Sequence, residues 1–282
     1  TILPALGWFP ALGARDVSAA PLQMFLATPG VAGAIMLSLS TGLVATFLSF
    51  IASFILVVTL SSFAPMHRLR SIMGPLIAVP HSTIAIGILF LLAPSGWLIR
   101  LVSPELTGFV RPPATGLLPD LEQHGLIIAL LAKEIPFLCL VSLAALSTQP
   151  ARQIIAIGRS LGYSKDAAMW LLVMPDIYRL IRLPLAAVLV FSVSVVDMSL
   201  VLGPGLPPPL AVMVLHGFED PDLLARLPAS AGALLQGGLA VLALALWRAG
   251  EVLTSAILTG WRRRGHRTRL PSMARHIPVS YT

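Results

Sequence analysis

Charged residues and cysteine are scarce in this sequence of 282 residues. Only 11% of the residues are charged and 56% are hydrophobic, whereas a typical soluble domain has about 25% charged residues. So large an apolar fraction would cover the surface of a soluble protein with one continuous apolar patch. The same numbers exclude a disordered or collagen-like chain, and the single cysteine, Cys139, excludes a disulfide scaffold. The composition therefore predicts an all-α, polytopic membrane protein.

The sequence also lacks the motifs of an ATP-hydrolysing or metal-dependent enzyme. Neither of its lysines, Lys133 and Lys165, follows a glycine, so the GxxxxGK[ST] phosphate-binding loop is absent. The six histidines form no HExxH or other metal-ligand spacing, and we interpret His81 and Cys139 as packing residues. We therefore expect no catalytic residue, metal or cofactor on this chain.

Long apolar runs are abundant. A helix needs about 20 apolar residues to cross a bilayer, and five runs meet this length: 31–60, 72–92, 125–146, 183–202 and 229–258. Residues 1–13 are apolar but too short to span. We expect them to be the outer end of a truncated first helix, with an interfacial segment as the alternative. The prediction is one transmembrane domain over residues 1–282.

Basic residues are distributed unevenly between the segments that join these runs. Only Arg15, Arg100, Arg111 and Arg226 fall on one side. Thirteen fall on the other: Arg68, Arg70, Arg152, Arg159, Lys165, Arg179, Arg182, Arg262, Arg263, Arg264, Arg267, Arg269 and Arg275. The positive-inside rule then makes 61–71, 147–182 and the basic tail 259–282 cytoplasmic, and turns 14–30, 93–124 and 203–228 outward. The net charge of +7 is thus a topology signal, and no aromatic-interleaved basic face indicates nucleic-acid binding.

Lys133, Glu134 and Asp197 are ionisable residues inside the apolar runs, whereas Arg248 and Glu251 lie toward the end of the last run. An ionised residue deep in a span costs about 2.5–3.5 kcal/mol on insertion scales, so each needs a partner or a water-filled cavity. Lys133 and Glu134 are adjacent and cannot face each other on one helix. At about 1.5 Å per residue, Lys133 is roughly 12 Å and Asp197 roughly 8 Å from the outer end of its run. The two side chains can therefore meet between helices.

Two interpretations of this polar group remain open. In the first, Lys133, Glu134, Pro136, Ser194 and Asp197 line a translocation path, and Pro136 kinks its helix. In the second, a buried ion pair of Lys133 with Asp197 fixes the register of two helices. The two interpretations are compatible.

The segment 147–182 has the pattern of a helix, a turn and a second helix. Pro150 suits a first helical turn, and Gly162 suits a helix stop. Ser164 is a good N-cap, and Asp166 follows in the first turn, where a negative charge favours the helix dipole. Pro175 is expected to end or bend the second helix.

The first of these two helices has an apolar stripe. Ile154, Ile157 and Leu161 form the stripe, and Arg152 and Arg159 lie off it. A short amphipathic helix beside a membrane binds either the membrane surface or a groove on a partner. The residues alone do not separate these two alternatives.

The turn and second helix resemble a known family. Gly162 is followed by nine residues and then by Leu172, Val173, Met174 and Pro175, a spacing similar to the EAA loop of ABC importer permeases. The tripeptide that names this loop is replaced by Ala156, Ile157 and Gly158. The resemblance covers nearly the whole chain and extends to these residues: Pro75, Pro80, Gly87, Asp197 and the run Leu202-Gly203-Pro204-Gly205. The contexts of Lys133-Glu134 and of 192–205 are most similar to thiamine-type permeases with two fused halves.

The resemblance implies the transmembrane domain of a type I importer in a bacterial inner membrane. It implies a coupling loop that docks on a cytoplasmic ATPase, which carries ATP and Mg²⁺. We expect that loop to use Arg152, Ile154, Ile157, Arg159, Leu161, Gly162, Ser164, Asp166 and Pro175. An external solute-binding protein and a second permease half are the other implied partners. A proton-coupled secondary transporter, with Glu134 and Asp197 as proton carriers, is the alternative.

Overall fold

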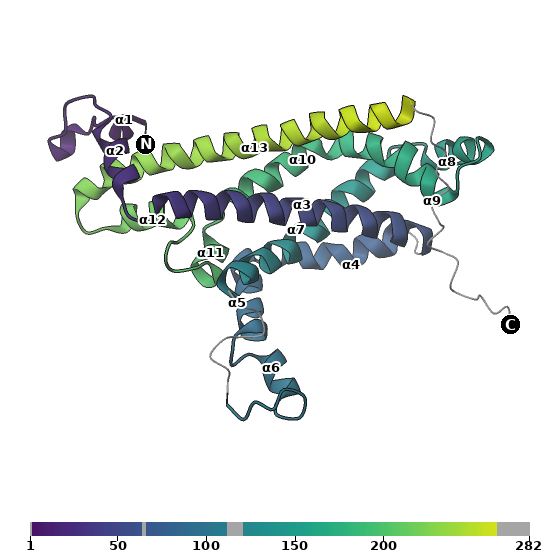
Figure 1. Ribbon diagram of the computed structural model, residues 1–282, viewed down its shortest axis with the longest axis horizontal. Coiled ribbons are helices and arrows are strands. Elements are labelled where there is room, and N and C mark those ends of the chain that lie inside the picture. The colour runs from purple at the N-terminus through teal and green to yellow at the C-terminus, as the bar shows by residue number, and fades with distance from the viewer. Residues whose placement is uncertain (1, 64–65, 112–120, 264–282) are drawn as a thin grey trace. The chain divides into compact units, whose positions relative to one another are not determined.

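A computed structural model describes residues 2–63, 66–111 and 121–263 (Figure 1). Every regular element in these ranges is helical, and the one extended pairing is an isolated bridge between Phe9 and Ala14. Five helical stretches are long and apolar enough to cross a membrane: Val31–Thr59, His81–Val102, His124–Ser147, Lys165–Ser194 and Leu223–Ala256. The prediction of an all-α polytopic membrane protein is therefore confirmed. The tail beyond residue 263 and residues 112–120 of the loop 93–124 lie outside the described residues.

The helices differ widely in length. The four long ones are α3 (Val31–Phe63), α7 (Leu121–Ser147), α10 (Met174–Ser194) and α13 (Arg226–Arg263). The shorter ones are α1 (Ile2–Ala5), α2 (Ala20–Ala27), α4 (Met66–Ala78), α5 (His81–Leu92), α6 (Trp97–Val102), α8 (Ala151–Ser160), α9 (Lys165–Ala168), α11 (Asp197–Leu202) and α12 (Leu210–Glu219). Three short turns complete the set: the 3₁₀ turns η1 (Pro10–Leu12) and η3 (Leu223–Ala225), and the π-helical turn η2 (Met169–Val173).

Two of the apolar runs are broken helices. The run 72–92 divides at Val79–Pro80 into α4 and α5, because proline lacks an N–H and disfavours the helical conformation of the residue before it. The run 183–202 divides at Val195–Val196, and α10 begins well before it, at Met174. This second break has no proline. In the last turn of α10, the hydroxyl of Ser194 donates to the carbonyl of Val190.

The chain divides into two compact units, and four long helices contribute residues to both. Unit 1 comprises Thr1–Leu48, Ala78–Glu134 and Ala187–Trp247. One of its apolar clusters joins α2, α3, α10, α12 and α13, and the other joins α3, α5, α7 and α11. Gly42 permits a close approach of α3 to α10, because a Cβ there would stand 2.8 Å from the backbone nitrogen of Val193.

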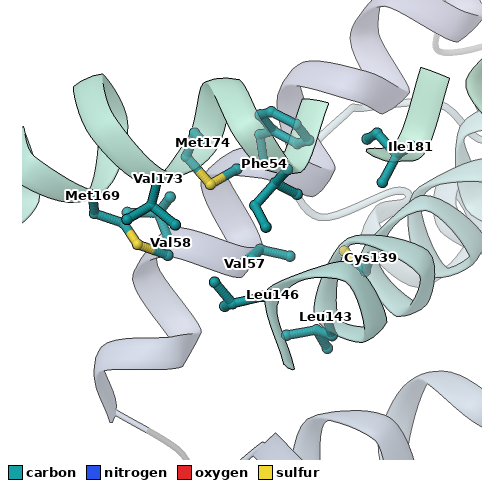
Figure 2. Close-up of a cluster of buried hydrophobic side chains, with 11 residues drawn as sticks. Phe54, Val57, Val58, Cys139, Leu143, Leu146, Met169, Val173, Met174 and Ile181 are labelled. Atoms are coloured by element: carbon teal, nitrogen blue, oxygen red, sulfur yellow. The ribbon is translucent and has the colours of Figure 1, made fainter. Parts of the chain in front are cut away.

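Unit 2 comprises Ser49–Ile77, Ile135–Ala186 and Arg248–Thr282. Figure 2 shows its core, in which side chains from α3, α7, η2 and α10 meet. Phe54 and Val57 of α3 pack with Leu143 of α7 and Val173 of η2 in this cluster. Cys139 belongs to the same core and is 2% exposed, which agrees with its interpretation as a packing residue.

Candidate functional site

The helix–turn–helix predicted over 147–182 is present in unit 2, where α8 and α9 pack against each other (Figure 1). Gly162 ends the first helix in the left-handed region, with φ of +93°. The amide of Gly162 donates to the carbonyl of Arg159, and the amide of Tyr163 donates to that of Gly158, both at 3.0 Å. These two bonds form a Schellman cap, which satisfies carbonyls that the helix end would leave unpaired.

The second helix begins as the sequence predicts. Ser164 has an extended backbone, and its hydroxyl accepts a bond from the amide of Ala167 at 3.1 Å. Asp166 lies in the first turn, where its charge favours the helix dipole. Because a cap stands on each side of the turn, residues 161–164 are held in one conformation.

The apolar stripe of α8 is divided, contrary to the prediction. Ile154 packs against the core of unit 2, whereas Ile157 and Leu161 are 60% and 61% exposed. At about 100° per residue, Ile157 lies roughly 110° from the middle of the inward face. That face consists of Ala151, Ile154, Ile155 and Gly158. The outward surface of the loop therefore carries Ile157 and Leu161 together with Arg152 and Arg159, which are both exposed.

Gly158 has a packing role that the sequence analysis missed. A Cβ at this position would stand 2.8 Å from both the Cβ of Ala168 and the Cδ1 of Leu172, so α8 crosses the following helix at close range. The sequence showed Gly158 only as a replacement in the EAA tripeptide. The spacing of only four residues between Gly158 and Gly162 was the one sign in the sequence that both glycines belong to the same helix–turn–helix.

Pro175 does not end the second helix. A π-helical turn, Met169–Val173, precedes it, and α10 starts at Met174 and continues to Ser194. A π turn contains one more residue than an α-helical turn. It lies where the ring of Pro175 would otherwise collide with the preceding turn. The loop is thus connected without interruption to a helix long enough to cross a membrane.

In unit 1, Lys133 is buried on α7 and is 7% exposed. Its ammonium group donates to the carbonyl of Val79, which lies at the break between α4 and α5. A helix end leaves carbonyls without donors, and a cation there also interacts favourably with the helix dipole. Lys133, which belongs to α7, therefore supplies the hydrogen bond that the carbonyl of Val79 lacks within its own broken helix.

Glu134, the next residue of α7, is 4% exposed and points to a different neighbour. The hydroxyl of Ser192 donates to its carboxylate, and the hydroxyl of Thr46 donates to Ser192 at 3.4 Å. Ser192 lies in the last turn of α10, just before the break at Val195–Val196. Sequence reasoning missed Ser192 and Thr46, because nothing local to either residue marks it as the partner of a distant acid.

The other residues predicted for the translocation path have different positions. Asp197 is exposed at the start of α11, and among the described contacts it forms no ion pair with Lys133. Ser194 donates to the carbonyl of Val190 in its own helix, at 2.6 Å. Pro136 is buried in unit 2, and α7 continues through it without a break. The ion pair of Lys133 with Asp197, one of the two interpretations that the sequence left open, is not among the described salt bridges.

His81 has more polar neighbours than its interpretation as a packing residue allowed. It is the first residue of α5, and its ring lies 4.8 Å from that of Phe191. It is also close enough to Lys133 and Asp197 to interact electrostatically with both. Pro80, directly before it, was the signal in the sequence that a helix begins at this residue.

A small cavity lies beside the α10/α11 break and has several hydroxyl groups in its wall. Its lining comprises Leu37, Ser38, Thr41, Leu126, Ser192, Val193, Val195, Ser199 and Pro209. The cavity has room for about one water molecule. Thr41 is 3% exposed, and its hydroxyl has no hydrogen-bond partner within the described part of the chain.

A second charged cluster, in unit 2, joins α10 to α13. Glu251 accepts bonds from the hydroxyl of Tyr178, from Arg182 at 3.1 Å and from Arg248. The guanidinium of Arg182 also lies 5.6 Å from the centre of the Tyr178 ring. Residues 2–63, 66–111 and 121–263 contain no group of three or more His, Cys, Asp or Glu side chains that could hold a metal ion.

Comparison with known proteins gives one informative similarity. No protein-family model matches the chain. The chain is similar to the inner membrane ABC transporter permease protein YnjC of Escherichia coli (strain K12), with 29% identity over 242 residues. The alignment covers 86% of this chain but only 44% of that relative, so the chain spans less than half of its length. Together with the five apolar helices, the similarity supports a transporter permease role.

Proposed function

We propose that this chain is a permease half of an ATP-driven ABC importer. It would form the membrane path for a small solute and work with an ATPase on another chain. The observation that carries the proposal is the capped loop of unit 2, which exposes the apolar side chains of Ile157 and Leu161 as well as two arginines, Arg152 and Arg159. The printed name of the similar protein, an inner membrane ABC transporter permease, supports the same function.

The shape of the loop favours a protein groove over the membrane surface. A helix that lies on a membrane buries a long apolar face among lipids, whereas α8 has only ten residues and its inner face is already covered by the core of unit 2. Two exposed apolar side chains on a conformationally fixed turn suit a pocket on a partner, because little ordering is needed on binding. Arg152 and Arg159 would add attraction to an acidic rim.

The proposed division of labour follows from this loop. The cytoplasmic ATPase would bind ATP and Mg²⁺, and this chain would carry no cofactor. Closure of the ATPase on ATP would move the loop. Through the continuous helix Lys165–Ser194, this movement would reach the membrane part of the permease. A second permease half, fused or separate, would complete the path, and an external solute-binding protein would deliver solute to 93–124 and 203–228.

The path itself would be lined from unit 1. Glu134 with Ser192, the exposed Asp197 and the half-buried His81 are polar groups within apolar helices, and such groups are rare in membranes outside functional sites. The resemblance to thiamine-type permeases makes a small polar solute the proposed cargo. The loop 147–182 and the tail would face the cytoplasm in the inner membrane of a bacterium.

The test compares two variants of one exposed residue. The full-length protein is purified from its native membranes, and co-purifying chains are searched by mass spectrometry for the GxxxxGK[ST] loop of an ATPase. Ile157→Glu is expected to lose this subunit, because it places a charge in an apolar contact. Ile157→Leu, which keeps the size and polarity, is expected to retain it.

Two results would overturn the proposal. One is the absence of any ATPase from the wild-type preparation, and the other is equal retention by both Ile157 variants. Solute uptake that survives ATP depletion but stops when the proton gradient is dissipated would instead establish the proton-coupled alternative. Protection of Cys139 from alkylation in both variants controls for folding, because this thiol is buried in the core of unit 2.

A further inference from the structure

Unit 1 contains two helix breaks, and each requires an explanation. Backbone groups that leave a helix at membrane depth must be satisfied by protein or by water in a cavity. The first break lies at Val79–Pro80 and the second at Val195–Val196. In the half-helices that follow them, Ile84 donates to Pro80 and Leu200 donates to Val196, so each helix restarts at once. Before the second break, the carbonyl of Val193 accepts a bond from the side chain of Gln236 on α13 at 3.2 Å.

One helix contacts both breaks through two adjacent residues. Lys133 donates to the carbonyl of Val79 at the first break. Glu134 accepts from Ser192, three residues before Val195 at the second. Adjacent residues on a helix point about 100° apart, so Lys133 and Glu134 can bind two different neighbours but not each other. Their adjacency, which cannot serve an ion pair within α7, suits a connection between two elements.

The two half-helices that follow the breaks also contact each other. α11 packs against α5, and both belong to one apolar cluster with the first half of α7. Ala85 of α5, Met198 of α11 and Leu130 of α7 are fully buried in this cluster. The small cavity beside the second break, lined by Ser192, Val195 and Ser199 among others, leaves that side incompletely filled.

We propose that Lys133 and Glu134 are positioning residues that tie both helix breaks to α7, so that α5 and α11 behave as one body. Lys133 holds the beginning of α5, and Glu134 holds the residue that leads into α11. Loss of either contact then frees both half-helices, because each half-helix packs on the other. This mechanical unit belongs to unit 1 alone and does not depend on the proposed ATPase.

The test measures the exposure of two introduced thiols against the native one. Ala85→Cys reports on α5 and Ser199→Cys reports on α11; both positions are buried, with exposures of 0% and 4%. The full-length protein in lipid nanodiscs is alkylated with N-ethylmaleimide, and each thiol is followed by mass spectrometry of its peptide. Cys139, buried in the core of unit 2, is the internal control.

The expected result is a joint response. Lys133→Met and Glu134→Leu should each raise the alkylation rates of both reporters by about tenfold or more, as loss of a hydrogen bond to a charged group changes an opening equilibrium. Glu134→Gln keeps an acceptor for Ser192 and should remain near the wild-type rates. Cys139 should stay protected in all three variants.

Three other results overturn the proposal. If Lys133→Met frees only the α5 reporter and Glu134→Leu only the α11 reporter, the two contacts are independent local caps. If neither variant changes the rates, the contacts do not hold the breaks. If Cys139 is exposed as well, the loosening involves the whole chain. If an introduced cysteine disturbs the packing, hydrogen–deuterium exchange of peptides from α5 and α11, in protein without the introduced cysteines, distinguishes the same outcomes.

Discussion

The most direct test of the loop geometry is a β-branched residue at Gly162. This glycine has φ of +93°, and nothing lies within 4 Å of the position that a Cβ would occupy. A substitution there therefore meets no steric obstacle from neighbours, and its cost is confined to the backbone. A left-handed conformation costs a residue with a side chain roughly 1–2 kcal/mol, and a β-branched residue is at the upper end of this range.

The strain is relieved when the turn leaves its native conformation. If the loop must keep the Schellman cap in order to dock, the variant has to restore the strained conformation, and the strain energy is subtracted from its free energy of association. About 1.4 kcal/mol corresponds to a tenfold weaker association. Gly162→Val should therefore weaken association with the ATPase by about tenfold, while the protein still inserts into the membrane. The assay is a titration of the purified ATPase against nanodiscs that contain the full-length permease.

Gly13 offers a matched control in the same chain. It has φ of +81° and open space at its Cβ position, so Gly13→Val carries the same kind of backbone strain at the end of η1 rather than in the loop. We expect Gly13→Val to bind the ATPase with wild-type affinity. Wild-type affinity in Gly162→Val, or an equal loss in both variants, would refute the argument that this turn positions the docking surface.

Four further predictions test single contacts. Gly158→Val should disturb the crossing of α8 with the next helix, because its Cβ would stand 2.8 Å from that of Ala168, and should make the loop more sensitive to protease than wild type. Glu251→Ala should lower the free energy of unfolding of unit 2 by about 1–2 kcal/mol, measured as a lower thermal midpoint. The lower end of this range is expected, because the arginine partners are half exposed and solvent screens their charges. Thr41→Val should raise the midpoint by removing a buried hydroxyl without a partner; a fall would show that a water bridges the cavity. Asp197→Asn should reduce transport but leave ATPase binding intact, and an equal loss of both would indicate a folding role.

Local chemistry was sufficient to predict the loop, whereas the break at Val79–Pro80 was not predicted although its cause is also local. Gly162 and Ser164 act through bonds to residues within five positions of themselves, so their residue types alone specify a helix stop and a helix start. Pro80 divides its run for an equally local reason, the missing amide proton. Pro175 shows the limit of that rule. The chain accommodates it with a π turn and continues as a helix.

The polar site could not be predicted in the same way, because its contacts join residues that are far apart in sequence. Lys133 binds a backbone carbonyl 54 positions away, and Glu134 binds a serine 58 positions away. A backbone carbonyl has no sequence signature, and Glu134 is adjacent to Lys133, so the sequence left Asp197 as the acid that Lys133 could meet. The break at Val195–Val196 was missed for a related reason, since no proline or glycine marks it.

The two kinds of residue therefore differ in what a substitution can reveal. In the loop, each side chain or glycine determines the conformation of its own turn, so a variant should alter docking without altering the membrane part. Lys133 and Glu134 instead connect elements that the chain brings together only after folding, and their cost of burial is offset only when both partners are in place. A charge retained inside an apolar helix at such a cost, with a broken helix as its partner, is better explained by control of helix position than by stability alone.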